Sequence, residues 1–127
     1  DETGLWRARV NGSPLTAFTS LDADARGVAG TGYFGVGGAD LGLGMLAGRD
    51  TGMGSDGFLL VFDHDLDVRH SRIFGARAPG AYTIDDGGEH VAIGHGALLL
   101  ALAVTGADDF DGVSIGSGGS VLRATLP

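Results

Sequence analysis

The sequence has no cysteine, and proline accounts for only 3 residues. Without cysteine, the chain can have no disulfide framework, no thiolate metal site and no cysteine nucleophile. The longest apolar run, Ala97–Val104, has 8 residues. A helix needs about 20 residues to cross a bilayer, so we expect no membrane insertion. No segment has the charged start and apolar centre of a signal peptide, and the chain begins at Asp1 rather than Met. We therefore expect a processed product or a fragment of a longer chain.

Charge is just as unevenly distributed among residue types. Lysine is absent, so all 8 basic residues are arginine, and aspartate outnumbers glutamate 14 to 2. Aspartate favours turns, whereas glutamate favours helix interiors, so this bias indicates loops and strands. The formal net charge of −8 disfavours nucleic acid and anionic membranes as partners.

Glycine, by contrast, is abundant, at 25 of 127 residues. Glycine without a three-residue period or low complexity is typical of tight turns and bulges between short strands. A hydrophobic content of 43% is too high for a disordered chain. The length suits one domain with a real core, so we expect a single domain over residues 1–127.

Short apolar, β-branched and aromatic runs separated by turn formers predict an all-β fold. No stretch has apolar residues at helical spacing between a cap and a terminal glycine. The expected strands are Leu5–Val10, Thr16–Leu21, Val28–Phe34, Phe58–Phe62, Val68–Phe74, His90–Ile93, Ala97–Val104 and Gly118–Leu126.

The chain also carries an internal repeat. Leu5–Gly12 aligns with Val68–Gly75 at a constant offset of 63. The order is one strand of the Leu5 type, then four strands, then three. The missing fourth strand of the second set is thus of the kind found at the N-terminus. This predicts two four-stranded, propeller-like blades, over about residues 13–75 and 76–127 plus 1–12, with Leu5–Val10 completing the second. A compact eight-stranded β-sandwich is the alternative.

Several short motifs carry a family resemblance. The pieces are a V-x-V-T-G strand, G-x-x-D-F-G-G, G-G-S-D-x-F-V, and L-W-x-x-x-F-G-G. They match Val28–Phe34, Gly38–Gly42, Gly54–Asp63, Leu5–Gly12 and Val68–Gly75, and again Ala103–Gly112 and Gly118–Leu126. As a set they resemble the bacterial β-propeller repeats usually described as seven-bladed.

That resemblance implies an interaction module of a large secreted or surface-attached bacterial protein, with no catalytic site. Two departures from the family matter. The tryptophan of the last strand occurs once, at Trp6, and Arg69 replaces it in the other copy. Two blades also cannot close a propeller of the usual 4–8 blades.

One acidic cluster is a calcium candidate. Asp63, Asp65 and Asp67 form a D-x-D-x-D pattern, which opens an EF-hand loop. Val68 stands where that loop needs glycine, and Phe74 stands where it needs glutamate. A solvated turn is the simpler interpretation of the cluster. A second cluster, Asp108, Asp109 and Asp111, is open to the same two interpretations.

Signals for catalysis are missing. The histidines His64, His70, His90 and His95 show no paired metal spacing, and no Gly-x-Ser-x-Gly motif occurs. Trp6, Tyr33 and Tyr82 are the only tryptophan and tyrosines, so few such side chains could stack on a sugar ring.

We therefore expect a non-enzymatic structural or interaction module that binds itself or a protein partner. A carbohydrate-binding lectin built from few-blade subunits is the alternative, and an enzyme ranks third. Two blades would leave two sheet faces uncovered, lined by residues such as those of Ala97–Val104 and Phe58–Phe62. Homo-oligomerisation would cover such faces.

Overall fold

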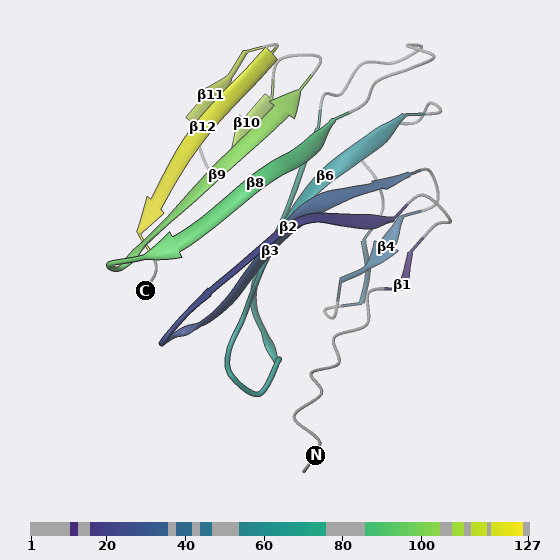
Figure 1. The fold of residues 1–127 in the computed structure, drawn as a ribbon. Coiled ribbons are helices and arrows are strands. Elements are labelled where there is room, and N and C mark those ends of the chain that lie inside the picture. Colours follow the sequence, from purple (N-terminus) through teal and green to yellow (C-terminus); the bar gives the residue numbers. More distant parts are fainter. Residues whose placement is uncertain are drawn as a thin grey trace.

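The computed structural model describes residues 11–12, 16–35, 38–41, 44–46, 54–75, 86–104, 108–110, 113–116 and 118–125. Every regular element in these ranges is a β-strand, which confirms the all-β class (Figure 1). None of the described residues lies in a helix long and apolar enough to cross a membrane.

The larger sheet has four antiparallel strands in the order β2-β3-β6-β7. Its strands are β2 (Ala17–Asp24), β3 (Gly27–Gly35), β6 (Ser55–Phe62) and β7 (Val68–Phe74). The strands are joined where the sequence supplies turn chemistry. Asp24 accepts a hydrogen bond from the Arg26 backbone N–H at 2.8 Å, which closes the β2–β3 turn.

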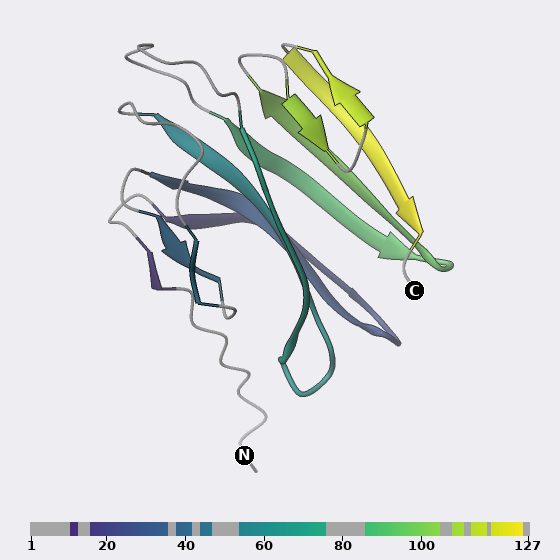
Figure 2. The ribbon, with the colours of Figure 1, turned by 180° about the vertical axis from the view of Figure 1, so that it is seen from behind.

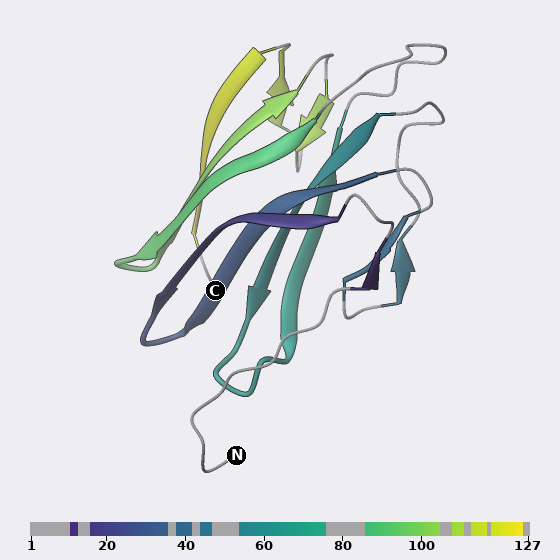
Figure 3. The ribbon, with the colours of Figure 1, turned by 45° about the vertical axis from the view of Figure 1, so that its right-hand side comes forward.

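The second sheet has three antiparallel strands in the order β12-β9-β8. These are β8 (Gly87–Gly94), β9 (Ala97–Val104) and β12 (Gly118–Thr125). His95 and Gly96 both have positive φ, 50° and 80°, so they form the primed two-residue turn that hairpins favour. Figures 2 and 3 show this sheet stacked on one face of the larger one.

Two small strand groups accompany the sheets. One joins β1 (Asn11–Gly12), β4 (Ala39–Asp40) and β5 (Met45–Leu46), and the other joins β10 (Asp108–Phe110) and β11 (Val113–Ile115). Neither group is among the strands expected from the sequence. Strands of two or three residues are too short for sequence alternation to reveal.

The first hairpins of the two sheets match in register. Asp24 pairs with Gly27 and Gly94 pairs with Ala97, so both members lie 70 residues apart. The irregularity also recurs at that offset, between Phe18 and Ser20 in one hairpin and between Gly88 and His90 in the other. The second half of the chain therefore repeats the local geometry of the first.

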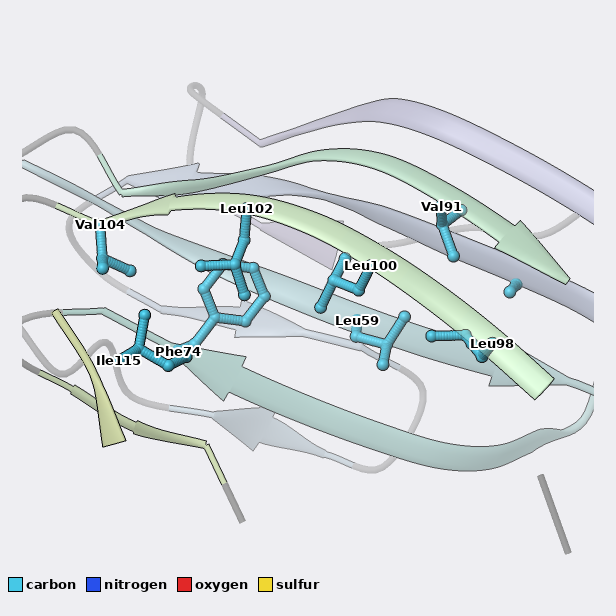
Figure 4. Packing of buried hydrophobic residues seen from close by; sticks show 9 residues of the cluster. Leu59, Phe74, Val91, Leu98, Leu100, Leu102, Val104 and Ile115 are labelled. Carbon is cyan, nitrogen blue, oxygen red and sulfur yellow. The ribbon is translucent and has the colours of Figure 1, made fainter. Parts of the chain in front are cut away.

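The inter-sheet core lies between the two sheets (Figure 4). β9 supplies its even-numbered side chains, because alternate residues of a strand face opposite sides. The larger sheet supplies Leu59, Phe74 and Ala29. The core consists of Ala29, Leu59, Phe74, Val91, Leu98, Leu100, Leu102, Val104 and Ile115.

A second core covers the far face of the larger sheet. It consists of Phe34, Ala39, Leu41, Phe58, Leu60 and Phe62. The expectation of an uncovered face along Phe58–Phe62 is therefore wrong. β6 is buried on both faces, since Leu59 belongs to one core and Phe58 and Leu60 to the other.

The two sheets lie close together at Gly88. A Cβ at this position would lie 2.8 Å from the Cβ of Thr31, so only glycine fits. Thr31 is fully buried, and its hydroxyl donates to the Phe58 carbonyl at 2.6 Å. This fixed hydroxyl cannot retreat from a larger neighbour.

Side chains of β2 cover the free edge of β8. The Val91 N–H donates to Ser20 Oγ at 3.2 Å, and the Ile93 N–H donates to Asp22 Oδ2 at 2.8 Å. The Thr19 hydroxyl donates to the Gly88 carbonyl. These bonds satisfy backbone groups that a sheet edge leaves unpaired.

The predicted completion of the second sheet by an N-terminal strand stays a prediction. Leu5–Val10, expected to complete the second sheet, lies outside the described residues. β12 ends its sheet with no further strand among the residues described.

The close approach at Gly88 generates a stability prediction. Gly88→Ala should lower the free energy of unfolding by about 1–3 kcal/mol, because the added methyl group overpacks the contact with Thr31. Gly94→Ala on the same strand is the control, since a Cβ there meets no atom within 4 Å. Urea denaturation of both variants checks the difference. Equal stabilities would show that the sheets are not held together at Gly88.

Candidate functional site

The calcium candidate forms the turn between β6 and β7. The Leu66 N–H donates to the Asp63 carbonyl at 3.1 Å, and Leu66 has a positive φ of 64°. Asp63 Oδ1 accepts hydrogen bonds from the N–H groups of Asp65 and Asp67, each at 3.0 Å. The carboxylate of Asp63 thus holds the turn in shape, as aspartate commonly does.

The second oxygen of that carboxylate is also engaged. Arg69 Nε donates to Asp63 Oδ2 at 2.7 Å, and the guanidinium forms an ion pair with the same oxygen. Burial, the largest influence, raises the pKa of Asp63. The Asp67 N–H and the Arg69 guanidinium outweigh it, so the pKa of Asp63 lies below its ordinary value.

Asp65 and Asp67 are exposed, with Asp63 half-buried between them and the sheet. In the described part of the chain, no three His, Asp or Glu side chains gather as a metal site needs. Calcium binding at these three aspartates stays a prediction, and it would require Asp63 to exchange Arg69 for the cation.

The other sequence candidates are dispersed. Asp108 and Asp109 begin β10, while Asp111 lies outside the described residues, as do Trp6 and Tyr82. Tyr33 is half-buried on β3. The four histidines lie on different turns and strands, and all are exposed. His64 Nε2 lies 2.8 Å from the Ala25 carbonyl, so this histidine links the β6–β7 turn to the β2–β3 turn.

Two buried carboxylates escaped the sequence analysis. Asp56 and Asp86 are 3% and 1% exposed, and both flank the backbone of Gly75. The Asp86 N–H donates to the Ser55 carbonyl at 3.1 Å, and Ser55 Oγ donates to the Asp86 carbonyl at 3.1 Å. These bonds tie the start of β8 to β6. The Gly-Ser-Asp-Gly run at 54–57 was the available signal.

The outer face of the three-stranded sheet carries large apolar side chains that are exposed to solvent. Leu99 and Val121 are 45% and 71% exposed there, although both are large apolar side chains. Cross-strand pairing places Leu99 beside Ala92 and Arg123, and Val121 beside Ala101. His90 lies opposite Ala101 on the same face, and we call the residues His90, Ala92, Leu99, Ala101, Val121 and Arg123 the outer face.

A pocket of about 310 Å³ opens beside the end of β12. Its walls are mostly apolar and come from both sheets and from β10. The lining residues are Arg26, Leu59, Val61, Phe62, Arg69, His70, Ile93, Leu98, Phe110, Ala124 and Thr125. No pair of these lining residues forms a nucleophile hydrogen-bonded to a general base, the arrangement that nucleophilic catalysis needs.

The turn geometry generates a pH prediction. Asp63→Asn should destabilise the protein at neutral pH, because it removes the charge that Arg69 and two N–H groups stabilise. A lowered folded-state pKa stabilises the folded state above the ordinary carboxyl value and ceases to do so as pH falls. The gap between wild type and variant should therefore shrink below about pH 4.

Thermal melts across this pH range check the effect, with Asp65→Asn as the exposed control. A gap that is constant with pH would show that the Asp63 charge is unimportant. Adding calcium to the same series tests the metal hypothesis, since calcium binding would raise the melting temperature of wild type and not of a triple variant with asparagine at 63, 65 and 67.

Comparison with known proteins identified no relative of this chain. No family model matches this sequence, and searches of curated proteins and of solved structures returned no match.

Proposed function

We propose that this chain is a non-enzymatic interaction module of two propeller-like blades that binds a second copy of itself through the outer face. The single observation that carries this proposal is the exposure of the large apolar side chains Leu99 and Val121 on one strand-paired surface. Monomeric proteins seldom leave such surfaces open unless a partner covers them. The family resemblance adds the expectation of a secreted or surface-attached bacterial protein.

The hairpin register supports blades over a sandwich. At the offset of 70, Val28 corresponds to Leu98 and Ala29 to Leu99. Val28 packs on the second core, whereas its counterpart Leu98 belongs to the inter-sheet core. Unlike faces therefore meet, as they do when sheets follow one another by rotation. A sandwich with two-fold symmetry would bring like faces together.

The same correspondence supports a sheet as the partner of the outer face. Ala29 lies in the inter-sheet core, on the face of the larger sheet that packs against the smaller one. Its counterpart Leu99 lies on the outer face. The outer face is therefore the equivalent of a surface that already packs against a sheet, so a further sheet is its natural partner.

Such an association is head-to-tail, because the two surfaces that meet are different. Head-to-tail contacts close into a ring or extend into a filament. A second copy of the chain satisfies the requirement with no other component.

The outer face generates a prediction about self-association. Val121→Asp should weaken it at least ten-fold, because burying an unpaired carboxylate costs more than about 1.4 kcal/mol. Val113→Asp is the control, since Val113 is 54% exposed but lies on β11, off the outer face. Sedimentation equilibrium measures both. A wild-type chain that stays monomeric at micromolar concentration would refute self-association, as would equal effects of the two variants.

A further inference from the structure

The edge of β12 differs from the other sheet edges. β2 and β8 cover one another through Thr19, Ser20 and Asp22. β7 carries Arg69, His70 and Arg72, and charged residues protect an edge from pairing. β12 has a single charge, Arg123, and pairs only with β9 among the residues described. Its open edge is suited to accept another strand.

The internal repeat says which strand is missing there. β3 pairs with β6 through Val28 and Phe62, and β9 pairs with β12 through Leu98 and Ala124. β12 is therefore the counterpart of β6. In the larger sheet a fourth strand, β7, pairs with β6, and nothing described occupies the corresponding place beside β12.

The N-terminal segment has the sequence of that fourth strand. Residues 5–10 align with β7 at the offset of 63. In β7, Val68, Ser71 and Ile73 pair with the second-core residues Phe62, Leu60 and Phe58. The second-core face corresponds to the pocket side of β12. A strand in this register places three apolar residues toward the pocket side, while Trp6, Arg7 and Arg9 take the places of the exposed Arg69, His70 and Arg72. The pocket-side positions are Leu5, Ala8 and Val10.

The position of β1 supplies an independent indication. In the described fold, Phe74 at the end of β7 packs on Phe110 of β10, with ring centroids 5.8 Å apart. Asn11 is the counterpart of Phe74 at the offset of 63, and Asp40 of β4 is the counterpart of Phe110 at the offset of 70. Asn11 pairs with Asp40. Asn11 thus meets β4 as the end of a fourth strand meets the small strand pair of the next sheet.

That geometry excludes the chain's own β12 as the partner. In the β7 register, Val10 lies opposite Ser120, and it is bonded to Asn11. Consecutive Cα atoms are 3.8 Å apart. β1 belongs to the side of the larger sheet that carries the second core, while β12 lies beyond the opposite face (Figures 1 and 3). Val10 cannot reach both places in one molecule.

We propose that residues 5–10 of one copy add as the fourth strand to β12 of a second copy. The added strand pairs with the open edge, and Leu5, opposite the pocket residue Ala124, lies beside the pocket. This inference rests on the proposed self-association and names the segment that joins the copies. The sheet of each copy is complete only when its neighbour contributes that strand.

Disulfide trapping tests the proposal in the full chain, which has no native cysteine to interfere. In the β7 register, Arg7 corresponds to His70 and lies opposite Arg123. One preparation carries Arg7→Cys and a second, of distinguishable mass, carries Arg123→Cys. Oxidising the mixture should give a mixed disulfide dimer at least five-fold above the control mixture. The control replaces Arg123→Cys by Glu89→Cys, an exposed position on the opposite edge of the same sheet.

A backbone variant provides the second measurement. Ala8→Pro removes an N–H from the proposed strand, so it should weaken self-association at least ten-fold, whereas Ala8→Val should preserve it. If Ala8→Pro associates normally and the two mixtures cross-link equally, strand addition is wrong, while a monomeric Val121→Asp still supports the outer face. A monomeric wild type overturns both proposals. An Arg7→Cys/Arg123→Cys double variant that cross-links only within one molecule overturns exchange between copies.

Discussion

The approach of β8 to the larger sheet is the contact on which the rest of the structure depends. Gly88 allows β8 to pack directly against the buried Thr31. Three β2 side chains hydrogen-bond to backbone groups on the edge of β8 that is not paired with β9. Because these bonds are directional, they fix the position of β8 along β2 as well as its distance. β9 and β12 follow by ladder pairing, so one strand edge determines how the whole second sheet lies. The inter-sheet core then fills the space that this contact defines.

This fixed orientation explains why corresponding residues of the two repeated hairpins contact different neighbours. Val28 and Leu98 occupy corresponding positions, yet they face different neighbours. The larger sheet is buried on both faces by its own chain. The smaller sheet is buried on one face, so Leu99 meets solvent although its counterpart Ala29 is fully buried. Nothing among the described residues covers the outer face, where Leu99 and Val121 are exposed.

Much of the strand structure was predictable, because alternation and turn chemistry are local properties. Ala97–Val104 is a strand with the expected bounds, and the turn after Gly94 falls at His95 and Gly96. The small strands β4 and β5 were missed, since two residues carry no periodicity. The role of Asp63 was also hidden. Its partner Arg69 lies six residues away, and only the turn geometry, with Leu66 at positive φ, brings the two together. Burial of Phe58 likewise depended on a cover from a Gly-rich segment.

The edges of the two sheets differ in how they are protected from pairing with another strand. A strand edge costs little when charged side chains stand along it, as on β7, or when a neighbour bonds to it, as on β8. β12 carries one charge, Arg123, and no described strand bonds to its free edge, and the pocket beside it includes Leu59 and Leu98, which belong to the inter-sheet core. A chain selected only for a stable monomer would gain by placing charge on that edge. Ser120, Val121 and Leu122 are uncharged, so they leave this edge able to pair. A strand added at this edge would give the smaller sheet the four strands that the larger sheet has.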